Sequence, residues 1–399
     1  MSARKHRFLW ITPLFLCCLL LLNAAASVQG ADAAQAGADS VTVTAAETVA
    51  GDNSVRYPQL AGMENEEIQQ TINNTIVVRA KIAQRLVTLS TLNSGGTGLT
   101  VRYDDYLANG VFSTVIDAKG IMENGRSGQQ YTALSFDLAT GRLLTAADLF
   151  ADVDAAVEYM ETTLEDTYLD ELSSYLVYAE LTPLPVDNFA LDADGVTFYY
   201  PADQFALLSG YCGAAQFNYD ELADYLLADA DALPARLGAL PETLTDAEIK
   251  AKIEETVAAG ELPRVRAKIG GDMTALIDRY RMLRQPDQYP GGRYYQLEAP
   301  MFRQVLVLSD ALTSGYANSN VEGVMSMRTS LYGIQTGVST RERWLQVLGE
   351  PDTSVAFDGD LAYDYGLPEG TADYYTYGGH RLMLYADEDG ILYAVRLTK

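Results

Sequence analysis

The sequence predicts an α+β fold with two domains, of which the second is a tandem repeat of a helix followed by three strands. Three observations carry this prediction. Helical and hairpin patterns are mixed along the chain, whereas a parallel sheet would need regular βαβ alternation. Residues 228–262 are rich in Ala, Leu and Glu, and Pro234, Pro241 and Pro263 punctuate this stretch, in which we place the domain boundary. Two stretches near the C-terminus share one order of helix and strand signals, as repeats do.

The N-terminus has the features of a secretion signal. The basic "MSARKHR" precedes the apolar run "FLWITPLFLCCLLLLNAAA", and small residues follow it. Cleavage after Ala26 or Gly30 makes residues 1–31 a signal peptide, whereas an uncleaved run is long enough to be a signal anchor. Both alternatives place the rest of the chain outside the cytoplasm. Residues 32–52 are rich in Ala, Thr and Gly, and we expect a flexible tether there, with a frayed strand at "VTVT".

Residues 53–230 form the first predicted domain, and turn signals delimit its strands. Asn-Gly at 109–110 and Asp-Gly at 194–195 are residue pairs typical of two-residue hairpin loops. Gly141 in "DLATGRL" takes the positive-φ position of a further short turn. Thr145 caps a short helix at "TAADLF".

Longer helices are predicted on both sides of these hairpins. The periodicity of "MENEEIQQTINNTIVVRAKIAQRL" predicts one helix whose apolar face carries Ile68, Ile72, Ile76 and Ile82. A longer acidic helix, "VDAAVEYMETTLEDTYLDEL", follows "TAADLF". The segment "AQFNYDELADYLL" predicts a strand that runs into a helix.

The predicted linker, residues 231–262, contains a helix that is capped by Thr245 and ended by Gly260. Residues 263–399 then contain the repeat. "GDMTALIDRYRMLRQPD" parallels "GVSTRERWLQVLGEPD", "RQVLVLSD" parallels "HRLMLYAD", and "VEGVMSMR" parallels "EDGILYAVR". Neither copy could bury its sheet well alone, so we expect both copies to pair into one continuous sheet.

Charge and rare residues exclude several classes of function. The net charge is −26, and the acidic residues are interspersed with apolar ones, which indicates a solvated surface that repels nucleic acid and anionic lipid. Beyond the signal segment, Cys212 is the only cysteine and His380 the only histidine. We therefore expect no intramolecular disulfide, no zinc site and no cofactor.

Two kinds of motif resemble functional sites, but the residues around them favour turns. Gly-Arg-Ser-Gly at 125–128 falls short of a nucleophile elbow, because a strand follows the serine instead of preceding it and no histidine is near. We expect a hairpin loop, from which Arg126 could contact a carboxylate of a partner. "LDADGV" and "ADEDGI" resemble calcium-loop fragments, but a strand follows each of them, which favours hairpin turns. We predict no metal site.

The aromatic residues supply the candidate binding surface. The chain holds 26 tyrosines, whose rings give large contact areas with polar tips. Core packing is the expectation for Tyr199, Tyr363 and Tyr393. In "DYYTYGGH" adjacent side chains point to opposite faces of a strand, so either Tyr374 or Tyr375 should point outward. The candidate ligand-binding residues are Tyr374, Tyr375, Tyr377, Trp344 if it is exposed, and Arg126.

Three stretches between residues 56 and 222 carry a family resemblance: "YPQLAGMENEEIQQTINNTI", "SFDLATGRLLTAADLF" and "GVTFYYPADQFALLSGYCGAAQFNYDEL". This region resembles the extracellular domain of lysozyme-sensing anti-sigma factors, which also occurs in front of cell-wall polysaccharide deacetylases. The resemblance implies an α+β module on the outer face of the membrane, whose known sensor members bind lysozyme. "IMENGRSGQQYTA" stands where sensor members carry a Gly-Gly-Ala-His-type segment. Only "MSARKHR" precedes the apolar run, so we expect no sigma-factor-binding domain.

The second domain resembles the helix-plus-sheet unit of β-lactamase inhibitor proteins and of small outer-membrane assembly lipoproteins. "TGVSTRERWLQVLGEPD" and "YYTYGGHRLMLYADEDGILYAVRL" carry this resemblance. A tandem pair is closer to the inhibitor architecture, which presents a sheet face to protein partners.

These features predict a secreted or membrane-tethered bacterial envelope protein that binds an extracellular protein or cell-wall glycan without catalysis. Two alternatives stay open. One is a hydrolase that uses carboxylates on peptidoglycan or peptides, because 54 acidic residues leave any catalytic pair unassigned without distances. The other is an inhibitor of a secreted enzyme, which the second resemblance implies.

Overall fold

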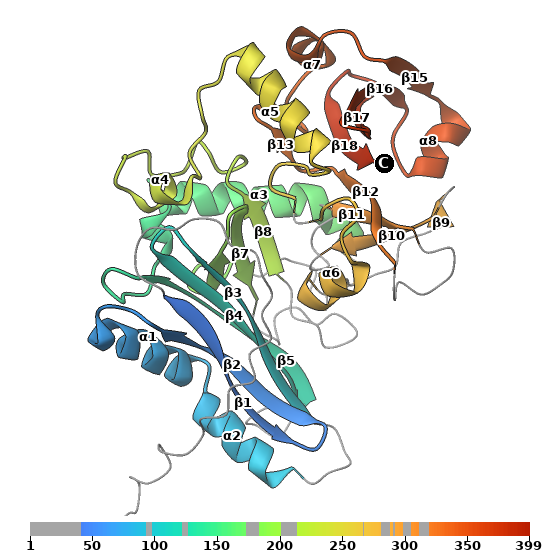
Figure 1. The fold of residues 1–399 in the computed structure, drawn as a ribbon. Helices are drawn as coiled ribbons and strands as arrows, with labels where there is room; N and C mark the ends of the chain where they lie inside the picture. The colour runs from blue at the N-terminus through green and yellow to red at the C-terminus, as the bar shows by residue number, and fades with distance from the viewer. Residues whose placement is uncertain are drawn as a thin grey trace, which may run out of the picture. The chain divides into compact units, whose positions relative to one another are not determined.

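The computed structural model confirms the α+β class (Figure 1). It describes residues 41–92, 98–121, 127–172, 183–200, 214–265, 267–280, 288–289, 292–297, 305–310 and 319–399. Their strands form sheets of five, eight, three and two strands, and residues Ser40–Lys399 cluster as one compact unit. Within these described ranges, no helix is long and apolar enough to cross a membrane.

The five-stranded sheet has its strands in chain order, and only the β2–β3 contact is parallel. Helices α1 (Glu66–Arg79) and α2 (Ile82–Thr91) pack against β2, and their apolar side chains join the core of this sheet. Asn109 and Gly110 have positive φ in the β3–β4 turn, as the Asn-Gly pair predicts. The strands are β1 (Thr42–Ala50), β2 (Asn53–Ala61), β3 (Leu99–Ala108), β4 (Val111–Ile121) and β5 (Ser127–Asp137).

Two expectations for this region are wrong in detail. Residues 42–50 were expected in a tether, but they form β1 and pair with β2 along their whole length. The single helix expected from the isoleucine spacing is broken at Lys81, which has a φ of 52°. Ile72 and Ile76 before the break and Ile82 after it are all buried. The chain turns at the break, so the apolar faces of both helices lie on the sheet.

A three-stranded sheet packs against β4 and β5. It consists of β6 (Phe189–Leu191), β7 (Gly195–Tyr199) and β8 (Ala214–Asn218). The hydroxyl oxygen of Ser113 accepts a hydrogen bond from the amide of Leu191 (2.8 Å), and the side-chain oxygen of Asn188 accepts one from the amide of Ala133 (2.9 Å). These bonds tie the small sheet to the large one.

Short and long helices complete this region. The short helix η1 (Ala146–Asp148) has the expected Thr145 cap, whose amide and hydroxyl both donate to Asp148. The acidic helix α3 (Val153–Leu172) follows, and Gly141 has the predicted positive φ. The helix expected after β8 is absent from the described residues 219–225, which form consecutive turns. A side-chain oxygen of Glu221 accepts the amide hydrogen of Asn218, as in a helix capping box, yet turns and no helix follow in these residues.

The segment expected as a linker is divided between two hydrophobic cores. Helix α4 (Leu233–Leu237) packs in the same core as the three-stranded sheet and α3. Helix α5 (Asp246–Ala258) begins with the predicted Thr245 cap and ends before Gly260, which has a φ of 78°. Its Ile249, Ile253 and Val257 are buried in the core of the C-terminal sheet.

The C-terminal region forms one eight-stranded sheet, so the predicted pairing of the two repeat copies is confirmed, but each copy contributes four strands and not the expected three. The order is β15-β16-β17-β18-β12-β11-β10-β9, and β12 and β18 join the copies. In the antiparallel contact between these two strands, Val324 pairs with Leu397, Met325 with Arg396 and Ser326 with Val395. The strands are β9 (Gln288–Tyr289), β10 (Gly292–Leu297), β11 (Val305–Ser309), β12 (Val321–Ser326), β15 (Thr353–Phe357), β16 (Gly370–Tyr377), β17 (His380–Asp387) and β18 (Leu392–Thr398).

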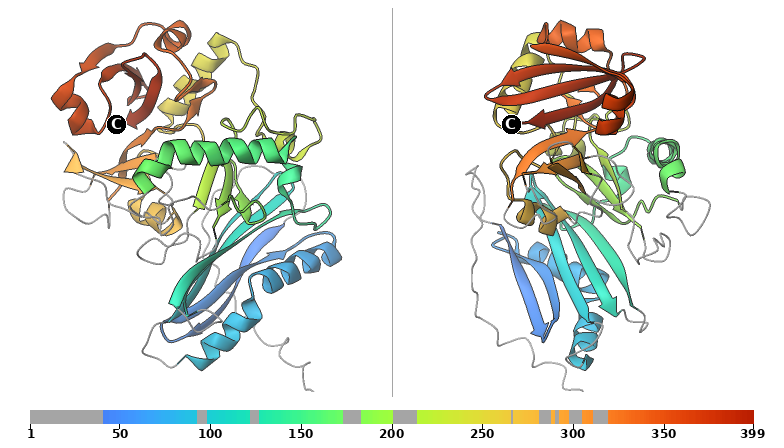
Figure 2. Two further views of the ribbon diagram at one scale, coloured as in Figure 1. Left: turned by 180° about the vertical axis from the view of Figure 1, so that it is seen from behind. Right: turned by 90° about the vertical axis from the view of Figure 1, so that its right-hand side faces the viewer.

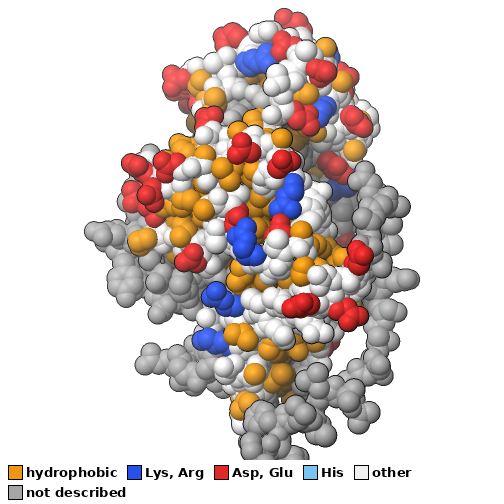
Figure 3. Space-filling view, turned by 90° about the vertical axis from the view of Figure 1, so that its left-hand side faces the viewer, with side chains coloured by type: hydrophobic (Ala, Val, Ile, Leu, Met, Phe, Trp, Pro, Cys, Tyr) orange, Lys and Arg blue, Asp and Glu red, His pale blue; other side chains and the backbone are white. Residues whose placement is uncertain are grey.

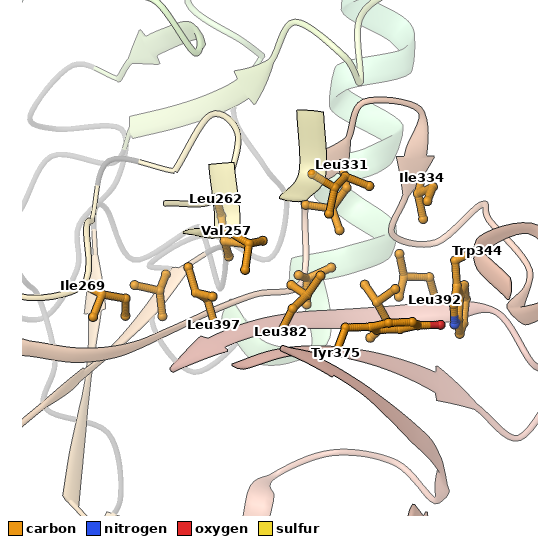
Figure 4. Packing of buried hydrophobic residues seen from close by; sticks show 14 of the residues in the cluster. Val257, Leu262, Ile269, Leu331, Ile334, Trp344, Tyr375, Leu382, Leu392 and Leu397 are labelled. Atoms are coloured by element: carbon orange, nitrogen blue, oxygen red, sulfur yellow. The ribbon is translucent and has the colours of Figure 1, made fainter. Parts of the chain in front are cut away.

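Helices lie on both faces of this sheet. Helices α5, α6 (Met273–Tyr280) and α7 (Arg341–Leu348) contribute buried residues to a core on one face (Figures 1 and 4). Helix α8 (Gly359–Tyr365) packs on the opposite face with Phe357 and Tyr385. The short pair β13 (Ser330–Leu331) and β14 (Ile334–Gln335) adds to the first core. We call the first face the covered face and the second the open face.

Candidate binding surface

The hairpin of β16 and β17 positions the predicted aromatic residues. Its loop is Gly378-Gly379, and both glycines have positive φ, which a two-residue hairpin loop requires. This turn fixes the register, so that Tyr374 lies opposite Met383 and Tyr375 opposite Leu382. Because side chains alternate along a strand, Tyr375 belongs to the covered face and Tyr374 to the open face.

Trp344 is not exposed, and that expectation is wrong. The indole of this α7 residue has 0% of its surface accessible and packs beside Tyr375 in the covered core (Figure 4). Its Nε1 donates a hydrogen bond to Oδ2 of Asp373 (3.1 Å). Helix α7 packs on the sheet and buries the apolar ring of Trp344 there. A buried indole needs a hydrogen-bond acceptor for its N–H group, and Asp373 supplies it.

Asp373 is the centre of a buried polar network that sequence reasoning did not identify. Nε and Nη2 of Arg341 donate to its two oxygens at 2.8 and 2.9 Å, and the Ser354 hydroxyl donates at 2.5 Å. Burial favours a raised pKa for Asp373, but the bonds from Arg341, Ser354 and Trp344 outweigh burial and lower it. This network attaches α7 to β15 and β16, so its role is structural.

Tyr375 and Tyr377 also belong to the covered face. Their rings are stacked with centroids 6.4 Å apart, and the Tyr375 hydroxyl donates to the carbonyl of Gly349 (3.0 Å). Tyr375 is 4% exposed, and Tyr377 is half-buried against the same core. Burial raises the pKa of both phenols, to about 12 for Tyr377. These two tyrosines therefore pack α5 and α7 onto the sheet.

Tyr374 has different surroundings on the open face. The guanidinium carbon of the exposed Arg381 lies 3.9 Å from the centre of the half-buried Tyr374 ring, which is a cation–π contact. Arg381 forms no ion pair with any residue in the described ranges. Burial raises the pKa of Tyr374, while Arg381 opposes this rise. An exposed arginine is thus held over an aromatic ring without a carboxylate partner there.

A second arginine–tyrosine contact lies on the same face. Arg396 is 5.4 Å from the ring centre of Tyr365, which α8 places edge-on to Phe357. The register puts Tyr374, Met383 and Arg396 in one row across three strands. We define the Tyr374 patch as Tyr374, Arg381, Arg396 and Tyr365. The residues of the patch come from β16, β17, β18 and α8.

The core-packing predictions for the other tyrosines are confirmed in two cases and wrong in one. Tyr199 packs with Tyr131 at a ring distance of 5.1 Å, and Tyr393 packs beside the α8 core, so both core predictions are confirmed. Tyr363 is 85% exposed, and the core prediction for it is wrong. The short helix α8 buries Ala362 instead. Successive residues of a helix point in different directions, so the residue after a buried one can face the solvent.

The Gly-Arg-Ser-Gly segment is described only in part. Ser127 begins β5 and pairs with Ile121 at the end of β4, so the strands on either side of residues 122–126 are antiparallel neighbours. Arg126 and Cys212 lie outside the described residues.

The two Asp-Gly segments are turns. The Asp192 carboxylate accepts hydrogen bonds from the amides of Asp194 and Gly195 between β6 and β7. Asp387 accepts from the amides of Asp389 and Ile391 between β17 and β18. Both carboxylates thus stabilise hairpins, as the turn interpretation predicts. Across the part of the chain that the structure describes, no group of three or more His, Cys, Asp or Glu side chains could hold a metal ion.

Comparison with known proteins gives distant similarities only. No family model and no curated protein matches the sequence. The chain is similar to a DUF3298 family member from Bacteroides fragilis, with 14% identity and a TM-score of 0.36 over 49% of this chain and 96% of that one. A DUF3298 family protein from Pseudomonas aeruginosa has 14% identity and a TM-score of 0.35 over 48% and 96%.

A DUF4309 family protein from Bacillus subtilis has 12% identity and a TM-score of 0.25, over 38% of this chain and 96% of that one. Such distant likenesses to bacterial proteins bear on neither ligand nor reaction. The narrower resemblances to anti-sigma sensors and β-lactamase inhibitor proteins stay predictions.

Proposed function

We propose that this chain is an extracytoplasmic bacterial envelope protein that binds an extracellular protein or a cell-wall glycan without catalysing a reaction. Export through the N-terminal signal segment, cleaved or kept as an anchor, is part of the proposal. The observation that supports it best is Arg381, an exposed cation stacked on Tyr374 with no ion-pair partner in the described ranges.

The chemistry of this pair favours a partner with an oxyanion. A guanidinium offers a planar fork of donors that fits a carboxylate or phosphate in a bidentate manner. Stacking on the Tyr374 ring restricts the guanidinium, so less conformational entropy is lost when a ligand binds.

The charge of the rest of the molecule adds selectivity. The chain has a net charge of −26, and acidic side chains are scattered over the face shown in Figure 3. This charge weakens the binding of a densely anionic polymer, so the oxyanions of a partner have to be recognised by local contacts with the cationic groups of the Tyr374 patch. Of the two partner classes, a cell-wall polymer that carries carboxylates or phosphates fits this patch better.

Co-sedimentation with purified cell wall tests the proposal. We expect the wild-type protein to bind, and Arg381→Gln to weaken binding about tenfold, because a charge-assisted hydrogen bond contributes about 1.5–3 kcal/mol. Arg381→Lys should recover part of the affinity, since it keeps the charge and loses the fork. Arg79→Gln, which changes another exposed arginine in α1, is the matched control and should bind like wild type.

Purified lysozyme is assayed in parallel. Binding to lysozyme alone, unaffected by Arg381→Gln, would show that the partner is a protein and that the Tyr374 patch is not the site. Failure of the wild type to bind either material contradicts the proposal.

The same incubations separate binding from catalysis. We expect no soluble wall fragments to be released. Fragment release that a single Asp or Glu substitution abolishes would show a hydrolase instead. A panel of secreted hydrolases and β-lactamases should keep its rates in the presence of the protein, and inhibition of one of them would favour the inhibitor alternative.

A further inference from the structure

The outer edge of β1 is an open sheet edge. β1 is the first strand of the five-stranded sheet and pairs with β2 along all nine residues, and no strand in the described ranges lies on its other side. The blue strands at one side of the sheet in the right-hand view of Figure 2 are this hairpin. Six of its nine residues are exposed, including Val49 at 62%.

This edge has none of the usual features that prevent pairing. Natural edge strands are protected by prolines, lysines, bulges or short length. β1 contains no proline or lysine, its register with β2 is unbroken, and Glu47 is its only charged residue. Thr and Val, which favour strands, make up five of its positions, Thr42, Val43, Thr44, Thr48 and Val49. The edge is therefore suited to accept a further strand.

The hairpin geometry shows which backbone groups point outward. Gly51 and Asp52 form a two-residue loop, and the closing residues of such a loop, Ala50 and Asn53, form a hydrogen-bonded pair. Hydrogen-bonded and non-hydrogen-bonded pairs alternate along an antiparallel ladder. The even-numbered residues of β1 thus bond to β2, and the odd-numbered residues from Val43 to Val49 direct their N–H and C=O groups outward.

The sequence of this edge is complementary to itself. Residues 43–49 are "VTAAETV", which is nearly the same when reversed. If a second copy lies antiparallel with Ala46 opposite Ala46, Val43 faces Val49 and Thr44 faces Thr48. Glu47 then faces Ala45, so the only charge of the strand does not oppose its own copy. A two-fold dimer interface requires this kind of self-complementarity.

We propose that β1 pairs with β1 of a second copy, and that the two five-stranded sheets become one continuous sheet across a two-fold axis at Ala46. The odd-numbered residues form the hydrogen-bonded pairs, with about eight new backbone hydrogen bonds. Ala46 and its counterpart form a non-hydrogen-bonded pair, with Cα atoms about 4.5 Å apart. The directions of the backbone groups and the side-chain pairing thus agree on one register.

Cysteine cross-linking tests this register. In a background in which Cys17, Cys18 and Cys212 are serine, Ala46→Cys should form a disulfide-linked dimer under mild oxidation, because about 4.5 Å between Cα atoms suits a disulfide. Thr48→Cys alone should stay monomeric on a non-reducing gel, since its counterpart faces Thr44. A mixture of Thr44→Cys and Thr48→Cys proteins should give mixed dimers. Equal cross-linking of all three single variants would contradict the register.

Sedimentation of the protein with its natural cysteines tests the dimer itself. The wild type should sediment as a dimer. Ala45→Pro should sediment as a monomer and should melt at the temperature of wild type that is diluted until its dimer dissociates, because it removes only an outward N–H group. Ala46→Pro is the matched control, since it removes a bond to β2 and should lower the melting temperature. A wild type that stays monomeric at high concentration would overturn the proposal and leave the edge for a strand of another protein.

Discussion

Tyr374 and Tyr375 are neighbours in β16, yet they lie on the two faces of the eight-stranded sheet and have different surroundings. Tyr375 is 4% exposed, bonds to Gly349 and stacks with Tyr377 beneath α5 and α7. Tyr374 is half-buried and carries the exposed Arg381 on its ring. The comparison shows that the pleat of a strand divides a cluster of tyrosines between two faces, one packed beneath helices and one where we propose recognition. Substitutions on the covered face should therefore change stability, and those on the open face should change binding.

The largest expected effect is that of Trp344→Ala on the covered face. Removal of a fully buried indole leaves a cavity and takes one of two donors from Oδ2 of Asp373, which keeps its bond from Arg341, and it should lower the free energy of unfolding by about 4 kcal/mol. Urea unfolding measures this change. Tyr363→Ala, which removes an 85% exposed aromatic side chain, should cost less than about 0.5 kcal/mol. Similar costs for both variants would contradict the assignment of Trp344 to the core.

Asp373→Asn should have the next largest effect, about 2–3 kcal/mol near neutral pH. It leaves Arg341 without its buried counter-ion, and loss of one partner of a buried pair is costly. Arg341 is partly exposed, which moderates the cost. Asp364→Asn on the exposed surface of α8 is the control and should be neutral. Urea unfolding of both variants gives the comparison.

The effect of Asp373 should depend on pH with a definite sign. Its pKa is lowered in the folded state, so its contribution to stability is complete above the ordinary aspartate pKa of about 3.9. The contribution is lost as the pH falls through the lowered pKa. The stability difference between wild type and Asp373→Asn should thus be constant at neutral pH and shrink below about pH 4. A difference that grows on acidification would show that the carboxylate is protonated in the folded protein.

Tyr375→Phe and Tyr374→Phe compare the two neighbours directly. Tyr375→Phe removes the donor to the Gly349 carbonyl and should cost about 1 kcal/mol. Tyr374→Phe keeps the ring beneath Arg381 and should cost close to nothing in thermal unfolding. The reverse order of costs would mean that the faces are assigned wrongly.

A small effect on stability is also expected of Arg381→Gln. Because Arg381 is exposed and its contact is limited to the Tyr374 ring, the free energy of unfolding should change by less than about 0.5 kcal/mol. Differential scanning calorimetry measures this change. A large loss would assign Arg381 a structural role and remove the basis for the proposed binding surface.

Local signals in the sequence predicted much of the fold. Asn-Gly at 109–110 gave a correct hairpin loop, and Thr145 and Thr245 gave correct helix starts. The hairpin expected at Asp-Gly 194–195 is present, but Gly195 begins β7 instead of lying in the loop. These features depend on a few neighbouring residues, whose φ preferences and hydrogen bonds act locally. The break at Lys81 was missed, because the isoleucine periodicity continues across it and neither glycine nor proline marks it.

The candidate site depended on contacts between distant parts of the sequence. Asp373 meets Arg341 and Trp344 across about thirty residues, and no local pattern indicates such a network. The Tyr374–Arg381 contact could be predicted more easily, because the Gly378-Gly379 loop fixes the register of the hairpin. The strand pattern could not show which tyrosine is open, because helices cover parts of both faces.

Photo-cross-linking from the two faces tests the central claim most directly. A benzophenone amino acid is placed at Tyr374 or at Tyr377, two half-buried tyrosines of the same strand. Each protein is irradiated with purified cell wall and, separately, with purified lysozyme. We predict covalent capture of cell wall from position 374 and none from position 377. Capture from position 377 with none from 374, or capture from neither, would contradict the account of the open face as the binding surface.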